Sequence, residues 1–324
     1  MKRIGALVAA VLVVCGLPSW GFRTVPPVFP RDVIADIIGQ IQEDQLREHI
    51  CQLQSREGGE YCNEQGSRWS CDGPAIDRAL DYARQYLERL GLKTRLDPYS
   101  LGCRPGLSHN IEAELPGTES TKLVLLVAHL DSYVMGISRG SPAPGADDDA
   151  SGSAAVLEAA RIFSQYKFKH TVRFVLFTGE EQWMVGSSAY VRRIASESAH
   201  VLGAFNMDMI GYDGDGNGLF EMWVRPGESE RLAELIVRTI ETYNIALTPE
   251  VLDDPRRGGD HESFWRRGYP ALMIIEDTEF GETEDFNPCY HTLCDVLRTL
   301  HLPYAKRIAQ AVIGAAAQLA EPVQ

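Results

Sequence analysis

The sequence predicts a single α/β domain with a largely parallel central sheet and helices on both faces. Apolar runs of strand length alternate with amphipathic segments of helix length over most of the chain, a pattern typical of parallel sheets. A length of 324 residues and a hydrophobic content of 44% suit one large globular domain. Such sheets place their sites at the carboxyl ends of the strands, so polar residues there are the first candidates for function.

The first residues have the layout of a secretory signal peptide. Two basic residues precede an apolar run, residues 4–17, which is too short to cross a bilayer comfortably. The small residues Ser19 and Gly21 then match a cleavage site for a signal peptidase, with cleavage expected after Gly21. A lipoprotein signal acylated at Cys15 is the alternative. We expect residues 1–21 to be removed, leaving an exported protein, periplasmic or secreted, with no stable membrane insertion after cleavage.

The net charge and the cysteine content indicate which partners and which covalent links the protein has. The net charge of −14 argues against nucleic acid as a partner. An even number of cysteines remains after the signal peptide, which in an exported chain indicates disulfides. Their proximity in the sequence favours disulfides among the first four cysteines and a separate disulfide between the last two. The sequence contains no CxxC pair, which argues against a zinc finger. The six are Cys51, Cys62, Cys71, Cys103, Cys289 and Cys294.

The N-terminal part of the mature chain reads as an extension. Residues 31–50 repeat apolar side chains at helical spacing, and a Gly-, Cys- and polar-rich loop follows over 55–73. Pro74 then opens an amphipathic helix. We therefore place a helical, Cys-rich extension at 22–73 and the main domain at 74–324.

Strands and helices alternate through the main domain. The run KLVLLVAHL hardly alternates between apolar and polar residues, which predicts a strand buried on both faces. The expected strands are 110–115, 122–130, 171–178, 201–207, 219–224 and 271–275. The expected helices after the first are 151–165, 186–196, 227–243 and 303–319.

Carboxylate and imidazole side chains follow three successive strand ends. They are His129 and Asp131, then Glu180 and Glu181, then Asp208. Three adjacent aspartates, 147–149, lead into the helix expected at 151–165, and the loop before the last helix carries His291 and Asp295.

Each of these features has an ordinary interpretation when it is taken alone. An exposed acidic turn explains residues 147–149, and a solvated loop explains a glutamate pair. Together they bring more nitrogen and oxygen donors to one sheet edge than a single tetrahedral zinc needs. This surplus indicates two metal ions that share a bridging carboxylate.

The segments AHLDS, GADDDASG, TGEEQ…VGS, NMDMIGY and YHTLCD, in this order, resemble the secreted co-catalytic di-zinc aminopeptidases, the bacterial leucyl aminopeptidase type of metallopeptidase clan MH. The resemblance runs from about Pro74 to the C-terminus and implies a zinc peptidase catalytic domain of the phosphorylase/hydrolase-like type. It implies two zinc ions per chain. Their ligands would be His129 and Asp208 for the first, Glu181 and His291 for the second, and Asp148 as the bridge.

The same resemblance implies roles for the neighbouring residues. Glu180 matches the general base, Asp131 the carboxylate that orients a metal-bound imidazole, and Tyr290 a tyrosine that donates to the tetrahedral intermediate. Asp149 follows Asp148 through a peptide bond that is cis in the family. The implied activity is removal of the N-terminal residue from peptides with a free N-terminus, by a water activated by two zinc ions, and we expect a monomer.

Three other functions remain open. Glutaminyl cyclases share the fold and the stretch DHESFWRRGYP, but the DDASG continuation, the short spacing after the glutamate pair and Tyr290 favour the peptidase. A carboxypeptidase would need a cationic anchor for a terminal carboxylate, and four arginines keep this function open: Arg256, Arg257, Arg266 and Arg267. A non-catalytic binding domain would be expected to lack one of the metal-ligating residues or the base, and none of these is missing.

Overall fold

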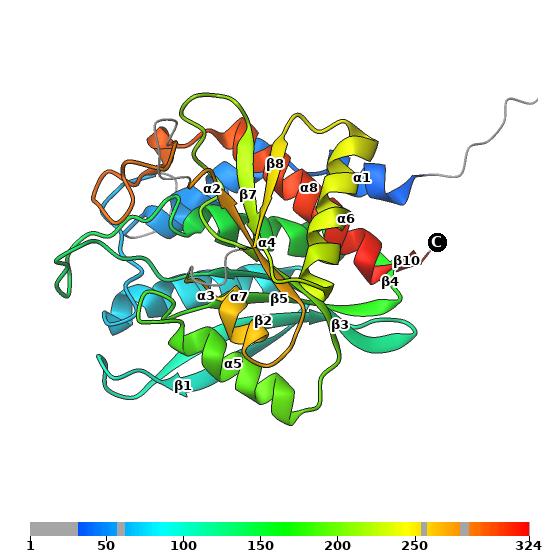
Figure 1. Ribbon diagram of the computed structural model, residues 1–324. Coiled ribbons are helices and arrows are strands. Elements are labelled where there is room, and N and C mark those ends of the chain that lie inside the picture. The colour runs from blue at the N-terminus through cyan, green and yellow to red at the C-terminus, as the bar shows by residue number, and fades with distance from the viewer. Residues whose placement is uncertain (1–31, 57–61, 254–257, 279–284, 324) are drawn as a thin grey trace, which may run out of the picture. The chain divides into compact units, whose positions relative to one another are not determined.

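The computed structural model describes residues 32–56, 62–253, 258–278 and 285–323. An eight-stranded sheet forms its centre, in the order β1-β2-β5-β3-β6-β9-β7-β8 (Figure 1). Four adjacent central strands are mutually parallel. They are β5 (His170–Phe177), β3 (Ser120–His129), β6 (Val201–Met207) and β9 (Ala271–Glu276). The predicted α/β fold class is confirmed, and each of these strands matches a predicted one.

The sheet becomes mixed towards its edges. On one side β1 (Lys93–Ser100) pairs antiparallel with β2 (Leu107–Leu115), which is itself antiparallel to β5. On the other side β7 (Leu219–Trp223) is antiparallel to β9 and parallel to β8 (Thr248–Leu252). The edge strands β1 and β8 were not predicted, because partly exposed edge strands lack the apolar pattern of buried ones. Two short strands, β4 (Lys167–Phe168) and β10 (Pro322–Val323), pair separately.

Helices cover both faces of the sheet (Figure 1). Successive residues of β3 alternate between two cores: Val124 and Leu126 belong to the larger, Leu125 and Val127 to the smaller. The larger core includes side chains from α3 (Gly73–Arg89), α4 (Ala150–Phe163), α6 (Glu228–Tyr243) and α8 (Leu302–Ala320). The smaller core includes side chains from α5 (Val185–Ser196) and the short α7 (His261–Trp265).

The N-terminal extension shares the larger core. The helix predicted over 31–50 is two helices, α1 (Val33–Gly39) and α2 (Glu43–Gln54). α1 packs against α8 and α2 against α4. The expected signal peptide, residues 1–21, lies outside the described residues. Within the described ranges, no helix combines the length and apolar character needed to cross a membrane.

Two of the expected disulfides are present. Cys71 bonds to Cys103, within the first four cysteines, and Cys289 bonds to Cys294 as predicted. Cys51, which is buried in α2, and Cys62 are free thiols rather than a third pair.

Candidate active site

The candidate ligands meet at the carboxyl edge of the parallel strands. His129 is the last residue of β3, Asp208 follows β6 directly, and Glu181 lies a few residues beyond β5. Asp148 comes from the loop before α4, and His291 from the loop before the 3₁₀ turn Leu297–Thr299. Parallel strands end at the same edge, which is why side chains far apart in the sequence come together here.

Two groups of donors form around the two histidines. Nε2 of His129 lies 3.0 Å from Oδ1 of Asp148 and 3.4 Å from Oδ1 of Asp208. Nε2 of His291 lies 3.1 Å from Oδ2 of Asp148 and 3.1 Å from Oε2 of Glu181. Each oxygen of Asp148 therefore faces a different histidine. In each group the donor atoms all lie within 4.8 Å of one another.

The donor set fits zinc. Zinc binds imidazole nitrogen and carboxylate oxygen at about 2.0–2.2 Å, so neighbouring donors around a tetrahedral ion are roughly 3.3–3.6 Å apart. The observed separations of 3.0–3.4 Å are close to this spacing. In addition, Oε1 of Glu181 is buried without a hydrogen-bond partner. Buried carboxylates crowded in this way need a cation.

The carboxylates set the proton affinity of both imidazoles. Burial lowers the pKa of His129, but the charge of Asp208 and the facing carboxylates raise it well above its ordinary value. Burial also opposes the shift at His291, where Asp148 and Glu181 raise the pKa to about 10. Without a metal, the facing carboxylates therefore favour the protonated form of both imidazoles.

Asp131 and Asp149 hold the first histidine. Nδ1 of His129 lies 3.0 Å from the backbone carbonyl of Asp131 and 3.7 Å from its carboxylate Oδ1, which leaves Nε2 to face the other ligands. The Asp149 carboxylate accepts from the backbone N–H of His129 at 3.1 Å and from that of Gly152, and so caps α4. The peptide bond between Asp148 and Asp149 is cis.

Asp295 holds the shared carboxylate, a role that sequence reasoning missed. Its two oxygens accept the backbone N–H groups of Asp147 at 2.8 Å and Asp148 at 3.1 Å. Asp295 is buried. The sequence analysis had placed it beside His291 in the loop before the last helix, but it assigned Asp295 no role.

Glu180 lies beside the metal ligands without belonging to either donor group. It lines the same pocket as His129, Asp148 and Asp208. Its backbone N–H donates to Oδ1 of Asp131 at 3.2 Å, which fixes its loop. Burial, together with nearby carboxylates, raises the pKa of Glu180 well above its ordinary value.

Tyr290 stacks on the second histidine. The two rings lie 3.8 Å apart at an angle of 21°, and the tyrosine side chain lines the pocket while remaining 40% exposed. Burial of the hydroxyl, with the charges of Asp148 and Glu181, raises the pKa of Tyr290. The phenol is therefore protonated at neutral pH and can donate a hydrogen bond into the pocket.

The pocket beside the ligands has an apolar wall. Its volume is about 500 Å³, within the range of small-ligand sites. Its charged or imidazole lining includes His129, Asp148, Glu180 and Asp208. Its apolar lining comes from one small hydrophobic cluster of β7, β9 and the loops around them: Met209, Trp223, Met273, Ile275 and Phe286.

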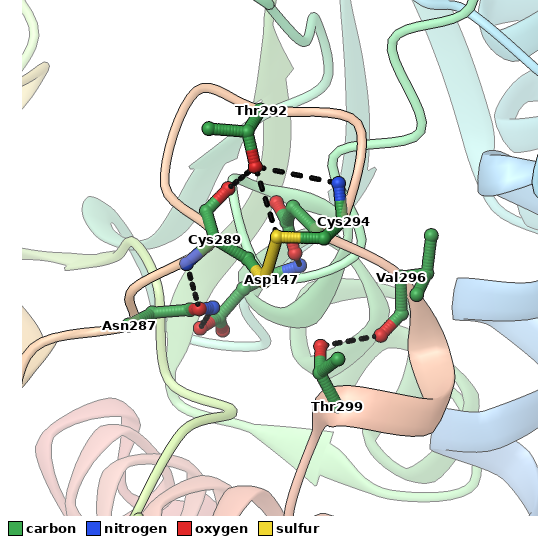
Figure 2. The surroundings of a disulfide bond; sticks show 8 residues. Asp147, Asn287, Cys289, Thr292, Cys294, Val296 and Thr299 are labelled. Carbon is green, nitrogen blue, oxygen red and sulfur yellow. Dashed lines mark hydrogen bonds between the residues drawn. A yellow bond between two sulfur atoms is a disulfide. The ribbon is translucent and has the colours of Figure 1, made fainter.

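The disulfide between Cys289 and Cys294 closes the loop that carries His291. Figure 2 shows Thr292 inside this loop, with its hydroxyl donating to the Cys289 carbonyl at 2.8 Å. Asn287 accepts from the Cys289 N–H and donates to Asp147 at 2.8 Å (Figure 2). The loop is thereby connected to the acidic run.

Replacing Cys289 and Cys294 by serine is expected to lower the free energy of unfolding by about 2 kcal/mol, the chain-entropy value for so short a loop. Because the loop presents His291, zinc content is expected to fall as well. The corresponding Cys71 and Cys103 variant opens a loop of greater length and is expected to lose about 4 kcal/mol. Denaturant unfolding and elemental analysis measure both effects, and full zinc content in the first variant would contradict this role of the loop.

The fold and the donor groups together define an α/β protein with a candidate metal-binding site at the carboxyl ends of its parallel strands. The model of peptidase family M28 matches residues 110–316, and the chain belongs to this family. A probable leucine aminopeptidase of Trichophyton verrucosum is 33% identical over 214 residues, which cover 63% of this chain. The chain spans 55% of that relative's length.

Solved structures show the same fold. The Legionella pneumophila LapA aminopeptidase aligns with a TM-score of 0.74 at 21% identity, over 90% of this chain and 75% of that one. A Bacteroides thetaiotaomicron glutaminyl cyclase aligns with a TM-score of 0.67 at 22% identity, over 85% and 97%. The fold is therefore common to both, and the site has to distinguish a peptidase from a cyclase.

Proposed function

We propose that the protein is an exported, zinc-dependent aminopeptidase that hydrolyses the N-terminal peptide bond of peptides. The observation that supports this most strongly is the pair of donor groups that share Asp148, one on each carboxylate oxygen, in a pocket that apolar side chains also line. Two zinc ions would be held by His129 and Asp208, by Glu181 and His291, and by Asp148 between them. Relatives that are named as leucine aminopeptidases agree with this proposal.

The protein's own residues would carry the proton transfers. Bound zinc ions lower the pKa of a water molecule and polarise the scissile carbonyl. Glu180 would accept a proton from the attacking water and return it to the amine nitrogen as the C–N bond breaks. The Tyr290 hydroxyl would donate a hydrogen bond to the oxygen on which negative charge develops.

The pocket supports a substrate with a free N-terminus and an apolar first residue. A positively charged α-amino group would meet the carboxylates of Glu180 and Asp208, which line the pocket. An apolar side chain would lie against the hydrophobic cluster that includes Met209, Trp223 and Met273. The presence of both kinds of lining supports this class of substrate.

Glutaminyl cyclase is the alternative, because a cyclase has the same fold. The resemblance to glutaminyl cyclases implies a site with one metal, whereas this chain has a second group of donors, Glu181 and His291, facing the other oxygen of Asp148. A carboxypeptidase finds less support. Of its possible anchors, Arg266 pairs with Glu262 on α7, and neither Arg266 nor the exposed Arg267 lines the pocket. The other two, Arg256 and Arg257, lie outside the described residues.

One assay tests the proposal directly. The purified protein, supplied with zinc, is given a panel of aminoacyl chromogenic substrates together with peptides that begin with glutamine. Hydrolysis of substrates with an apolar first residue, and two zinc ions per chain, are expected. Cyclisation of the glutamine peptides with one zinc would establish the alternative.

The remaining parts of the proposal concern location and organisation. Residues 1–21 would be a signal peptide, residues 22–73 an N-terminal extension, and residues 74–324 the catalytic domain. The two disulfides agree with an exported protein. We propose a monomer in the periplasm or outside the cell.

Zinc affinity is expected to rise with pH. The neighbouring carboxylates raise the pKa of His291 to about 10, so the metal-free imidazole carries a proton at pH 7 that zinc has to displace. At pH values below that pKa, each displaced proton makes the apparent zinc affinity rise about tenfold for every unit by which the pH rises. The affinity falls by the same factor for every unit by which the pH falls. Competition with a chelator at pH 6, 7 and 8 measures this. An affinity independent of pH would contradict protonated metal-free histidines.

A further inference from the structure

The segment between α2 and α3 places an arginine inside the protein. The side chain of Arg68 is 1% exposed, and it is among the largest fully buried side chains. Burial of a guanidinium is costly unless its donors are bonded and its charge is compensated. The loops that carry the candidate metal ligands meet both conditions.

Arg68 donates three hydrogen bonds to backbone carbonyls of two different loops. Nε donates to Leu130 at 2.7 Å, Nη1 to Pro144 at 2.6 Å and Nη2 to Gly145 at 2.7 Å. Leu130 directly follows His129, and the other two acceptors shortly precede the acidic run. One planar group therefore fixes the distance between the loop of the first histidine and the loop of the shared aspartate.

The backbone around Arg68 connects the same two loops. Its N–H donates to the hydroxyl of Ser132 at 3.1 Å, and that hydroxyl donates to the carbonyl of Ala143 at 2.7 Å. The Ala143 N–H donates in turn to Gly66 at 2.8 Å. The loops approach so closely that a Cβ on Gly145 would lie 2.5 Å from that of Ser132.

The charge of Arg68 acts on the same place. The carboxylates whose charges act on it are Asp295, Asp149, Asp148 and Asp131. A positive charge here repels a zinc ion, whereas the hydrogen bonds hold two ligand loops in place. Charge and geometry thus have opposite effects on zinc affinity, and an experiment can separate them.

We propose that Arg68 is a positioning residue, which holds His129 and Asp148 at their ligand spacing before zinc binds. The inference rests on the proposed zinc-dependent function. This proposal also assigns a role to the Cys-rich segment: through Arg68 it connects the loop after His129 with the loop before Asp148.

Arg68→Lys keeps the charge but loses the planar fork, so it cannot reach three carbonyls at once. We expect the zinc affinity of the folded variant, measured by competition with a chromogenic chelator, to fall by about 10–100-fold. Arg68→Met, which also removes the repelling charge, is expected to bind zinc more weakly than the wild type. Tighter binding by Arg68→Met would overturn the proposal.

Arg193→Lys is the matched control. Arg193 is also a mostly buried arginine, but it pairs with Asp97 and Glu112, away from the ligand loops. We expect the Arg193→Lys variant to have a lower thermal stability than the wild type, while its zinc affinity changes by less than about threefold. Equal zinc affinity in Arg68→Lys and Arg193→Lys would overturn the positioning role.

If neither Arg68 variant folds, Ser132→Ala serves instead, since it removes the link between Arg68 and Ala143. Its zinc affinity is expected to fall by up to about tenfold. An unchanged affinity would overturn the proposal. A wild-type protein that binds no zinc would refute the proposed function instead, so the two failures are distinguishable.

Discussion

Replacing Glu180 by glutamine is expected to lower kcat by roughly 10²–10⁴ while both zinc ions remain bound. Glutamine has nearly the same size as glutamate but cannot accept the proton of the attacking water. Glu180 lines the pocket and belongs to neither donor group, so the metal content should not change. KM should change little, because the lost interaction stabilises the transition state. Steady-state kinetics and elemental analysis of the same sample measure both quantities.

Glu181→Gln is the matched control, since it makes the same chemical change at the adjacent residue. Oε2 of Glu181 lies 3.1 Å from Nε2 of His291, so this variant is expected to lose zinc from the second donor group. Added zinc should restore part of its activity, whereas it should not help Glu180→Gln. Near wild-type turnover of zinc-loaded Glu180→Gln would exclude Glu180 as the base.

Replacing Asp148 by asparagine is expected to weaken both zinc sites at once. Each oxygen of this carboxylate faces a different histidine, and an amide supplies one oxygen and no negative charge. Activity is expected to fall at least as far as for loss of the base, by roughly 10²–10⁴. Zinc titration with a competing chelator shows whether both binding steps are affected.

Asp208→Asn separates the shared ligand from an unshared one. Asp208 belongs only to the group of His129, at 3.4 Å from its Nε2, so one zinc should bind with unchanged affinity. The two variants therefore predict different titration curves from the same chemical change. A single weakened site in Asp148→Asn would exclude the bridging role.

The central strands could be predicted because their residues are buried on both faces. The apolar run from Leu123 to Ala128 is a signal that depends on no partner. β1 and β8 could not be predicted in this way, because an edge strand is stabilised by its one neighbour and keeps polar residues on its exposed side.

The break between α1 and α2 left a signal in the sequence that the single helical pattern over 31–50 overlooked. Apolar residues recur three or four positions apart from Val33 to Ile41, but the next one, Leu46, comes five positions later, and α1 ends at Gly39. The tertiary structure shows where each helix packs: α1 lies against α8, whereas α2 lies against both α4 and α8.

The candidate ligands could be predicted as a set, because parallel strands place His129, Glu181 and Asp208 at one edge. Their pairing was expected only from the resemblance to the family and did not follow from the residues themselves. Which oxygen of Asp148 faces which histidine depends on the loop that precedes α4 and on the bonds from Asp295. These contacts join residues almost 150 positions apart.

The sequence by itself determined the fold class and the sheet edge at which the candidate donors lie, because hydrophobic periodicity and residue chemistry are local properties. The tertiary structure alone decided which oxygen of Asp148 faces each histidine, the stacking of Tyr290 on His291 and the burial of Arg68 between two loops. These depend on distances between segments that are remote in the chain. A surface arginine and Arg68 look the same in a sequence, and only its three backbone acceptors distinguish it.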